Sequence, residues 1–295
     1  MTKEVRMRVH RFTTRATTLV ALAATLAVSA PAGAQRRASA QVGANCVGGF
    51  QALFDEVEPV PLTPAEVDEV VYLREEEKLA RDVYLTLAER WQLPIFANIA
   101  RAEQQHMDAV LLLLELQGIP DPVIDDAIGV FSDAELGSLF VELTEDGAVD
   151  LVSALTVGAT IEDMDLADLY DLLSMTDNDH VELVAHNLAK GSRNHLRAFV
   201  RALTAQGATY EPQYLDESAF DAILASDMEQ RMYYTADGEP VPACGAAVAG
   251  FGMRRGPGQP NGQGESQAGG NGSGAGECDG TGPHGEGNGG AGGGI

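Results

Sequence analysis

Residues 95–117 read IFANIARAEQQHMDAVLLLLELQ, and their apolar side chains recur at the spacing of an α-helix. Gly118 followed by Pro120 ends this segment, which is a common way for a helix to stop. Glu103 and His106 lie three residues apart within the apolar stripe. A segment of this length with polar groups on its apolar side is typical of one helix in a bundle.

The rest of the middle of the chain is also predicted to be helical. The sequence Thr63-Pro64-Ala65-Glu66 is a capping box with proline at the first helical position, so a helix begins there. No convincing alternating pattern of a β-strand is present. The further predicted helices span residues 63–93, 132–147, 148–174, 177–207 and 216–231. Four long and two short helices predict an all-α bundle.

A long connection separates the second and third long helices. It spans residues 118–147 and contains a short helix of its own. A crossover of this length allows the two helices it joins to run parallel. Bundles with one such crossover are the ferritin-like folds, so we expect a ferritin-like four-helix bundle.

Each long helix places a potential metal ligand on its apolar stripe. A buried carboxylate is costly unless it is paired or bound to a cation, so such groups on four helices indicate one shared site. The candidate metal ligands are Glu77, Glu103, His106, Glu162, Asp165 and His195. Di-iron bundles use the same number of carboxylates and imidazoles. This mixed oxygen and nitrogen set favours one or two Fe or Mn ions over a metal that prefers thiolates.

Several of these candidates have an alternative interpretation. Glu75 and Glu76 form a charge run with Glu77, and such runs usually face solvent, so Glu76 is an alternative ligand to Glu77. Glu162 and Asp165 lie in an acidic stretch that is also compatible with a solvated helix face.

The two histidines and Tyr84 also have alternative interpretations. For Glu103 and His106 the alternative is a solvated pair, although the neighbours of this pair on the stripe are apolar. His195 is compatible with a core histidine as well as with a ligand. Tyr84 lies two turns after Glu77, where its hydroxyl would either bond a ligand carboxylate or simply belong to the core.

Four segments together resemble the DUF2202 family of the ferritin-like superfamily and are distantly similar to rubrerythrin. The segments are LREEEKLARDVY (73–84), NIARAEQQHMDAV (98–110), VGATIEDMDLADL (157–169) and GSRNHLRAF (191–199). The resemblance covers roughly residues 63–227. It implies the fold and a metal site more than a reaction.

The resemblance assigns ligand roles to individual residues. The matching positions are Glu77, Glu103, His106, Glu162, Asp165 and His195. The sequence departs from the pattern at Ser192, where a second bridging glutamate is expected. Serine is a poor iron ligand, and Asp165 would have to compensate from the third long helix.

Composition excludes several classes of protein. The chain has 295 residues, with 19 Lys+Arg against 44 Asp+Glu and a net charge of −25, so no nucleic-acid partner is expected. Aromatic residues make up 6%, which does not favour an all-β sandwich. The sequence contains no CxxC, HExxH or GxSxG motif and no P-loop.

The first 34 residues have the order of an export signal: basic residues, a short apolar stretch at 18–29, and Ala32-Gly33-Ala34 as a cleavage site. The apolar stretch is shorter than the about 20 residues of a membrane span. Cleavage after Ala34, with Ala40 as a second candidate, predicts a secreted or periplasmic protein with no stable membrane span.

The predicted domains are the signal peptide (1–34), an N-terminal segment (35–62), the ferritin-like bundle (63–232) and a glycine-rich disordered tail (233–295). Residues 245–295 hold 21 of the 33 glycines and cannot bury enough apolar surface to offset chain entropy. Export permits disulfides, and a Cys46–Cys244 bridge would join the two ends of the domain, leaving Cys278 in the tail.

Two functions are compatible with these observations. The first is an exported Fe- or Mn-binding protein, with an oxidoreductase reaction on metal ion, O₂ or peroxide. The second is a non-catalytic extracellular binding or structural module with a degenerate site, which Ser192 and the glycine-rich tail favour. Metal ions are the expected partners in the first case, and the sequence is compatible with a homodimer.

Overall fold

The computed structural model of the chain describes residues 47–244. The predicted signal peptide (1–34), Cys46, Cys278 and the glycine-rich stretch 245–295 lie outside the described residues.

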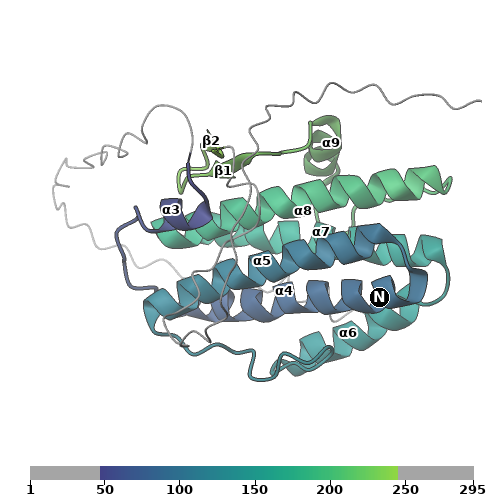
Figure 1. The fold of residues 1–295 in the computed structure, drawn as a ribbon, viewed down its shortest axis with the longest axis horizontal. Helices are drawn as coiled ribbons and strands as arrows, with labels where there is room; N and C mark the ends of the chain where they lie inside the picture. The colour runs from purple at the N-terminus through teal and green to yellow at the C-terminus, as the bar shows by residue number, and fades with distance from the viewer. Residues whose placement is uncertain (1–46, 245–295) are drawn as a thin grey trace, which may run out of the picture. The chain divides into compact units, whose positions relative to one another are not determined.

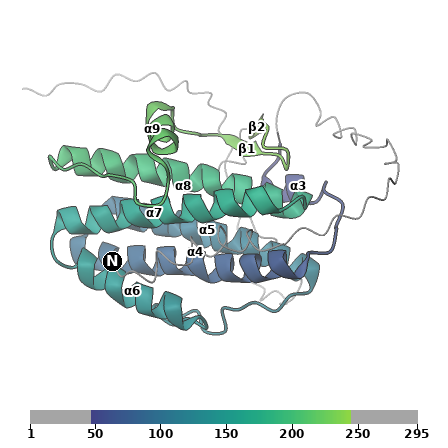
Figure 2. The ribbon, with the colours of Figure 1, turned by 180° about the vertical axis from the view of Figure 1, so that it is seen from behind.

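Four long helices pack side by side as a bundle (Figures 1 and 2). The first two form one closely packed pair, the last two form another, and the pairs meet through α4 against α7 and α5 against α8. The long helices are α4 (Pro64–Trp91), α5 (Pro94–Gln117), α7 (Leu151–Met175) and α8 (Asp179–Ala205). The predicted all-α bundle is confirmed.

The predicted capping box and glycine stop define helix ends in the structure. Thr63 N donates to Glu66 Oε2 over 2.7 Å, and Glu66 N donates to Thr63 Oγ1 over 3.3 Å, which completes the predicted capping box. Gly118 ends α5 with φ of 66°, a left-handed conformation that glycine adopts at little cost.

The connection between α5 and α7 is the predicted crossover, and it contains α6 (Ala134–Gly147). Trp91 Nε1 donates to Gly147 O over 2.9 Å, and Arg90 Nε donates to Ala148 O over 3.0 Å. The end of α6 therefore lies beside the end of α4, which is also where α5 begins. Since α7 follows α6 directly, α5 and α7 run in the same direction (Figure 1).

Charged side chains on α4 hold this crossover in place. Lys78 Nζ donates to Asp82 Oδ2 over 2.5 Å and to Ala127 O over 2.9 Å, and Gly129 N donates to Asp82 Oδ2 over 3.0 Å. The carboxylate of Glu75 accepts two backbone N–H groups at the start of α6, over 2.6 and 2.8 Å. These contacts replace water around groups that α4 buries.

The structure differs from the sequence prediction at both ends of the bundle. A short helix, α3 (Phe50–Phe54), precedes it, and α9 (Glu217–Ala225) stops before the predicted residue 231. Strands β1 (Met232–Tyr234) and β2 (Pro240–Pro242) form an antiparallel pair, although no strand is predicted. The boundary predicted between residues 232 and 233 therefore falls inside this hairpin.

The hairpin is fixed to α8 through Asn187, whose Nδ2 donates to Tyr234 O and whose Oδ1 accepts from Tyr234 N, over 2.8 and 2.9 Å. Cys244 N donates to Val47 O over 2.9 Å. Cys244 is disulfide-bonded, and the predicted Cys46–Cys244 bridge stays a prediction because Cys46 lies outside the described residues. Between residues 47 and 244, every helix is too short or too polar to cross a bilayer.

Candidate metal centre

Five of the six predicted ligands meet in the middle of the bundle, and all five are buried. They come from every long helix: Glu77 on α4, Glu103 and His106 on α5, Glu162 on α7 and His195 on α8. Their exposed fractions run from 2% for the glutamates to 9% for His195, so water does not solvate these charges. A side chain at Gly191 would overlap the ring of His106, so this glycine makes room for the imidazole.

Glu77, Glu103 and His106 form one group of potential ligands. His106 Nδ1 lies 3.2 Å from Glu77 Oε2 and 2.7 Å from Glu103 Oε2. The three ligand atoms lie within 4.8 Å of one another, a spacing at which one ion can contact all of them.

Glu103, Glu162 and His195 form a second such group. His195 Nδ1 lies 2.9 Å from Glu103 Oε1 and 3.4 Å from Glu162 Oε2. Glu103 therefore belongs to both groups, with Oε2 facing His106 and Oε1 facing His195. The arrangement is that of a carboxylate shared between two adjacent cation positions.

Buried polar atoms that lack a hydrogen bond indicate whether a cation would fit among these residues. Within residues 47–244, Glu77 Oε1, Glu103 Oε1 and His195 Nδ1 are buried and have no hydrogen-bond partner. Glu103 Oε1 and His195 Nδ1 are close enough for a hydrogen bond but are not aligned for one. Such atoms are costly to bury, and a bound cation would satisfy them. The residues fit a pair of divalent ions with oxygen and nitrogen ligands.

Without metal, the carboxylates and imidazoles stabilise one another by holding protons. Burial raises the pKa of Glu77 to about 7, against the opposing effect of His106. Burial opposes charge on His195, but Glu103 and Glu162 outweigh it and raise the pKa of His195 to about 10. Burial also opposes the charge of Glu103, and the two histidines outweigh it and lower the pKa of Glu103. Bound cations would compete with these protons.

Asp165, the sixth predicted ligand, belongs to neither group among the described residues. Burial, followed by the charges of Glu77 and Glu162, raises its pKa well above the usual range, and the neighbouring Ser192 hydroxyl opposes this shift. The Ser192 hydroxyl donates to Leu188 O over 3.1 Å and is fully buried. The position where the pattern expects a second bridging glutamate therefore holds no carboxylate, and Asp165 lies beside it.

Glu76, the alternative ligand to Glu77, faces the acidic residues of α7 and not the histidines. Burial, and then the charges of Asp168 and Asp165, raise the pKa of Glu76 well above its usual range. Glu76 also shares a hydrogen bond with Asp168. The structure thus brings Glu77 to the histidines and places Glu76 in a second acidic cluster. Asp168 is not among the predicted ligands, although it lies on the acidic stretch of α7 with Glu162 and Asp165.

Tyr84 lies against the second group of ligands. Its hydroxyl donates a hydrogen bond to Glu162 Oε1 and lies 3.3 Å from Gly158 O. The ring is fully buried, with its centroid 5.4 Å from that of Phe199. The ring therefore packs in the core while the hydroxyl orients the carboxylate of Glu162, a candidate ligand.

The family described as "Uncharacterized protein domain (DUF2202)" matches residues 66–227. This is more than half of the chain and includes every residue of the two ligand groups. The chain belongs to the DUF2202 family. The predicted resemblance of the four segments to DUF2202 is confirmed.

A relative of this DUF2202 protein is "Uncharacterized protein MJ0754" of Methanocaldococcus jannaschii, which is 52% identical over 172 residues, covering 58% of this chain and 93% of the relative. The crystal structure of hypothetical protein MJ0754 from Methanococcus jannaschii DSM 2661 is similar to this structure, with a TM-score of 0.58 at 51% sequence identity. That match covers 59% of this chain and 99% of the other. Neither name states an activity.

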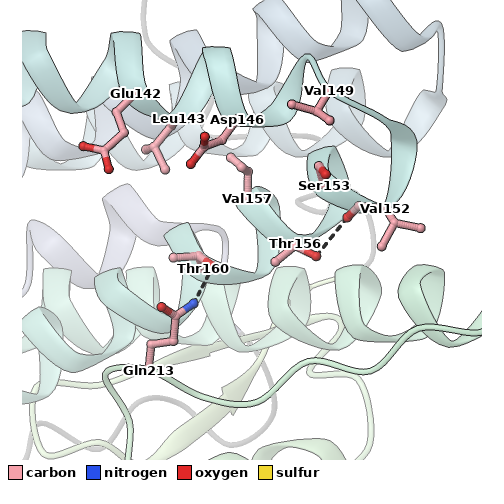
Figure 3. Close-up of a pocket in the computed structure, with 10 residues that line it drawn as sticks. All are labelled: Glu142, Leu143, Asp146, Val149, Val152, Ser153, Thr156, Val157, Thr160 and Gln213. Atoms are coloured by element: carbon pink, nitrogen blue, oxygen red, sulfur yellow. Dashed lines mark hydrogen bonds between the residues drawn. The ribbon is translucent and has the colours of Figure 1, made fainter. Parts of the chain in front are cut away.

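The DUF2202 region also contains a cavity of about 350 Å³ between α6 and α7 (Figure 3). Gln213 Nε2 donates to Thr160 Oγ1 over 3.1 Å at one side of it. Thr160 precedes Glu162 by two residues, which on a helix turns the two side chains about 200° apart. The cavity therefore lies on the face of α7 opposite the metal ligands. Its lining residues are Glu142, Leu143, Asp146, Val149, Val152, Ser153, Thr156, Val157, Thr160 and Gln213.

Proposed function

We propose that this protein is an exported, ferritin-like metal-binding protein that holds two Fe or Mn ions between its four long helices. The observation that carries the proposal is Glu103, whose two oxygens face two different histidines, 2.7 Å from His106 Nδ1 and 2.9 Å from His195 Nδ1. A carboxylate shared in this way fits two adjacent cations. The export part of the proposal rests on the order of basic, apolar and small residues in residues 1–34.

We further propose that the bound ions serve an oxidoreductase reaction on metal ion, O₂ or peroxide. Fe or Mn, when bound, would supply the exchange of electrons with such a substrate. The protein's own residues would neutralise the ions, fix their positions and keep bulk water out of the interior. Tyr84 would hold Glu162 in one orientation through its hydroxyl.

A specific observation favours a second candidate function, a non-catalytic binding or structural module. Ser192 supplies a buried hydroxyl where a second bridging glutamate is expected, so only one carboxylate is shared between the two positions. Such a centre would retain metal without turning over a substrate.

Counting retained metal tests the proposal. The full chain is loaded with Mn²⁺ or with Fe²⁺ under anaerobic conditions, dialysed against a chelator and analysed for metal per chain. We expect about two ions in the wild type. Glu103→Gln removes the shared charge with little change in shape, and it should weaken retention by more than the about 10–100-fold that loss of an outer hydrogen bond costs.

Glu115→Gln is the matched control, because Glu115 lies on the same helix and is exposed. It should retain metal like the wild type. Equal metal content in the wild type and in Glu103→Gln would contradict the proposed centre. Consumption of O₂ or peroxide by the loaded wild type, absent in Glu103→Gln, separates the oxidoreductase from the non-catalytic module.

A further inference from the structure

A second group of acidic side chains lies beside the metal centre, where α4 packs against α7 (Figure 2). We call Glu76, Asp165 and Asp168 the side cluster. Glu76 precedes the ligand Glu77, and Asp165 and Asp168 follow the ligand Glu162 by one and two helical turns. Asp165 and Asp168 therefore continue the ligand row of α7, and Glu76 meets them from α4.

Each of the two interior members of the side cluster buries one carboxyl oxygen that has no hydrogen-bond partner among the described residues. Glu76 is 3% exposed and Asp165 is 5% exposed. Within residues 47–244, Glu76 Oε1 and Asp165 Oδ1 have no hydrogen-bond partner. The cations nearest in sequence on α4 are already engaged: Arg74 pairs with Asp121, and Lys78 with Asp82.

The side cluster is continuous from the edge of the bundle to the ligands. Asp168 is half-buried and shares a hydrogen bond with Glu76. The charges of Asp165 and Glu77 act on Glu76, and those of Glu77 and Glu162 act on Asp165. Each carboxyl group therefore interacts with the next, and the last of them interact with both ligand groups.

The side cluster is not arranged as a third resting place for an ion. Among the described residues, only the two Glu/His groups bring three ligand atoms within 4.8 Å of one another. A divalent cation entering a dry interior must exchange its water for other oxygen ligands in succession. A row of carboxyl oxygens, two of them buried and without a hydrogen-bond partner among the described residues, offers such ligands.

We propose that Asp168, Glu76 and Asp165 form the entry path by which a divalent cation passes from solvent to the Glu/His centre. This inference rests on the proposed metal binding. Asp168 receives the cation at the edge of the bundle, and Glu76 and Asp165 transfer it to Glu77 and Glu162. The path acts on the rate of loading and leaves the number of bound ions unchanged.

The test is the rate at which the metal-free full chain takes up Co²⁺, followed by absorbance in a stopped-flow instrument, with the final number of ions measured separately. Glu76→Gln and Asp168→Asn keep the side-chain shapes and replace one carboxyl oxygen, a possible cation ligand, by an amide nitrogen that does not bind a cation. Each should slow uptake by about tenfold or more, with the wild-type number of ions at saturation. The wild-type rate should also fall more steeply with added salt than the rates of the variants.

Asp171→Asn is the matched control, since Asp171 is exposed on α7 three residues after Asp168. It should load at the wild-type rate, and circular dichroism should show that each variant is folded. Wild-type rates in both Glu76→Gln and Asp168→Asn would overturn the entry path. Fewer ions at saturation in either variant would also overturn it, because that residue would then be a ligand. A wild type that binds no Co²⁺ would refute the proposed function itself.

Discussion

Replacing Asp82 by alanine is expected to destabilise the fold by about 3–5 kcal/mol, the cost of removing one partner of a buried ion pair. Asp82 and Lys78 are both 0% exposed, and their charged atoms lie 2.5 Å apart. Without Asp82, the Lys78 ammonium group keeps only Ala127 O and the ring of Phe131, whose centroid lies 4.5 Å away. Gly129 N also loses its acceptor, which removes one of the contacts that hold the crossover to α4.

Urea denaturation of the full chain measures this loss, with Asp82→Asn as a second variant that keeps the shape and removes only the charge. Asp126→Ala is the control, because Asp126 pairs with Arg81 at 2.7 Å but its side chain is 68% exposed. The buried Arg81 keeps Asp82 and Gln104 as partners, and an exposed carboxylate contributes about 0–1 kcal/mol, so this control should stay close to the wild type. A loss below about 1 kcal/mol in both Asp82 variants would contradict the structural role of the pair.

Helix ends and the order of helices are predictable from the sequence because the signals are local. The capping box at Thr63 and the stop at Gly118 depend on residues within one turn of each helix end. The strands β1 and β2 have three residues each, which is too few for an alternating pattern to be visible. They are held by Asn187 on α8, a contact between residues 47 positions apart in the sequence.

The contacts of the charged residues on α4 cannot be predicted from the sequence alone. Glu75, Glu76 and Glu77 look like a solvated charge run, but α4 is packed against α5, α6 and α7, so no face at this level is free for solvent. Each glutamate therefore meets a different neighbour: the start of α6, the side cluster and His106. Helical spacing singles out Glu77 for the centre, but it cannot show what the two adjacent glutamates contact.

The position of Asp165 outside both ligand groups has a similar cause. It shares the stripe of Glu162, but it lies one turn further along α7, where its neighbours are Ser192 and the glutamates of α4. Periodicity defines a face of the helix, whereas the level of each residue along the bundle depends on how the helices pack. Glu162, one turn earlier, is the residue that lies opposite His195.

The second large effect is expected from metal itself. An ion present at a thousandfold excess over its dissociation constant stabilises a folded protein by about 4 kcal/mol. For a domain of about 200 residues, this corresponds to a rise in Tm of roughly 8–16 °C. We expect Mn²⁺ to raise the Tm of the metal-free full chain by this order, and we expect the rise to grow with pH.

The pH dependence follows from the protons that metal must displace. The pKa of His195 in the folded, metal-free protein is raised from 6.5 to about 10. The stability contributed by this proton is fully present below about pH 6.5 and is lost as pH rises towards 10. Glu77 acts in the same direction between 4.5 and about 7. Rising pH therefore weakens the metal-free protein and strengthens metal binding, so both changes widen the difference in Tm.

Thermal unfolding between about pH 6 and about pH 8.5, with and without Mn²⁺, measures this difference. Groups away from the centre, such as Lys190 with a pKa lowered by burial to about 8, act equally on both samples and cancel. Glu103→Gln should lose the metal-induced rise, and Glu115→Gln should keep it. Calorimetry in two buffers of different ionisation enthalpy should show protons released on binding. A rise in Tm that shrinks with pH would mean that the ions bind away from Glu77, Glu103 and the two histidines.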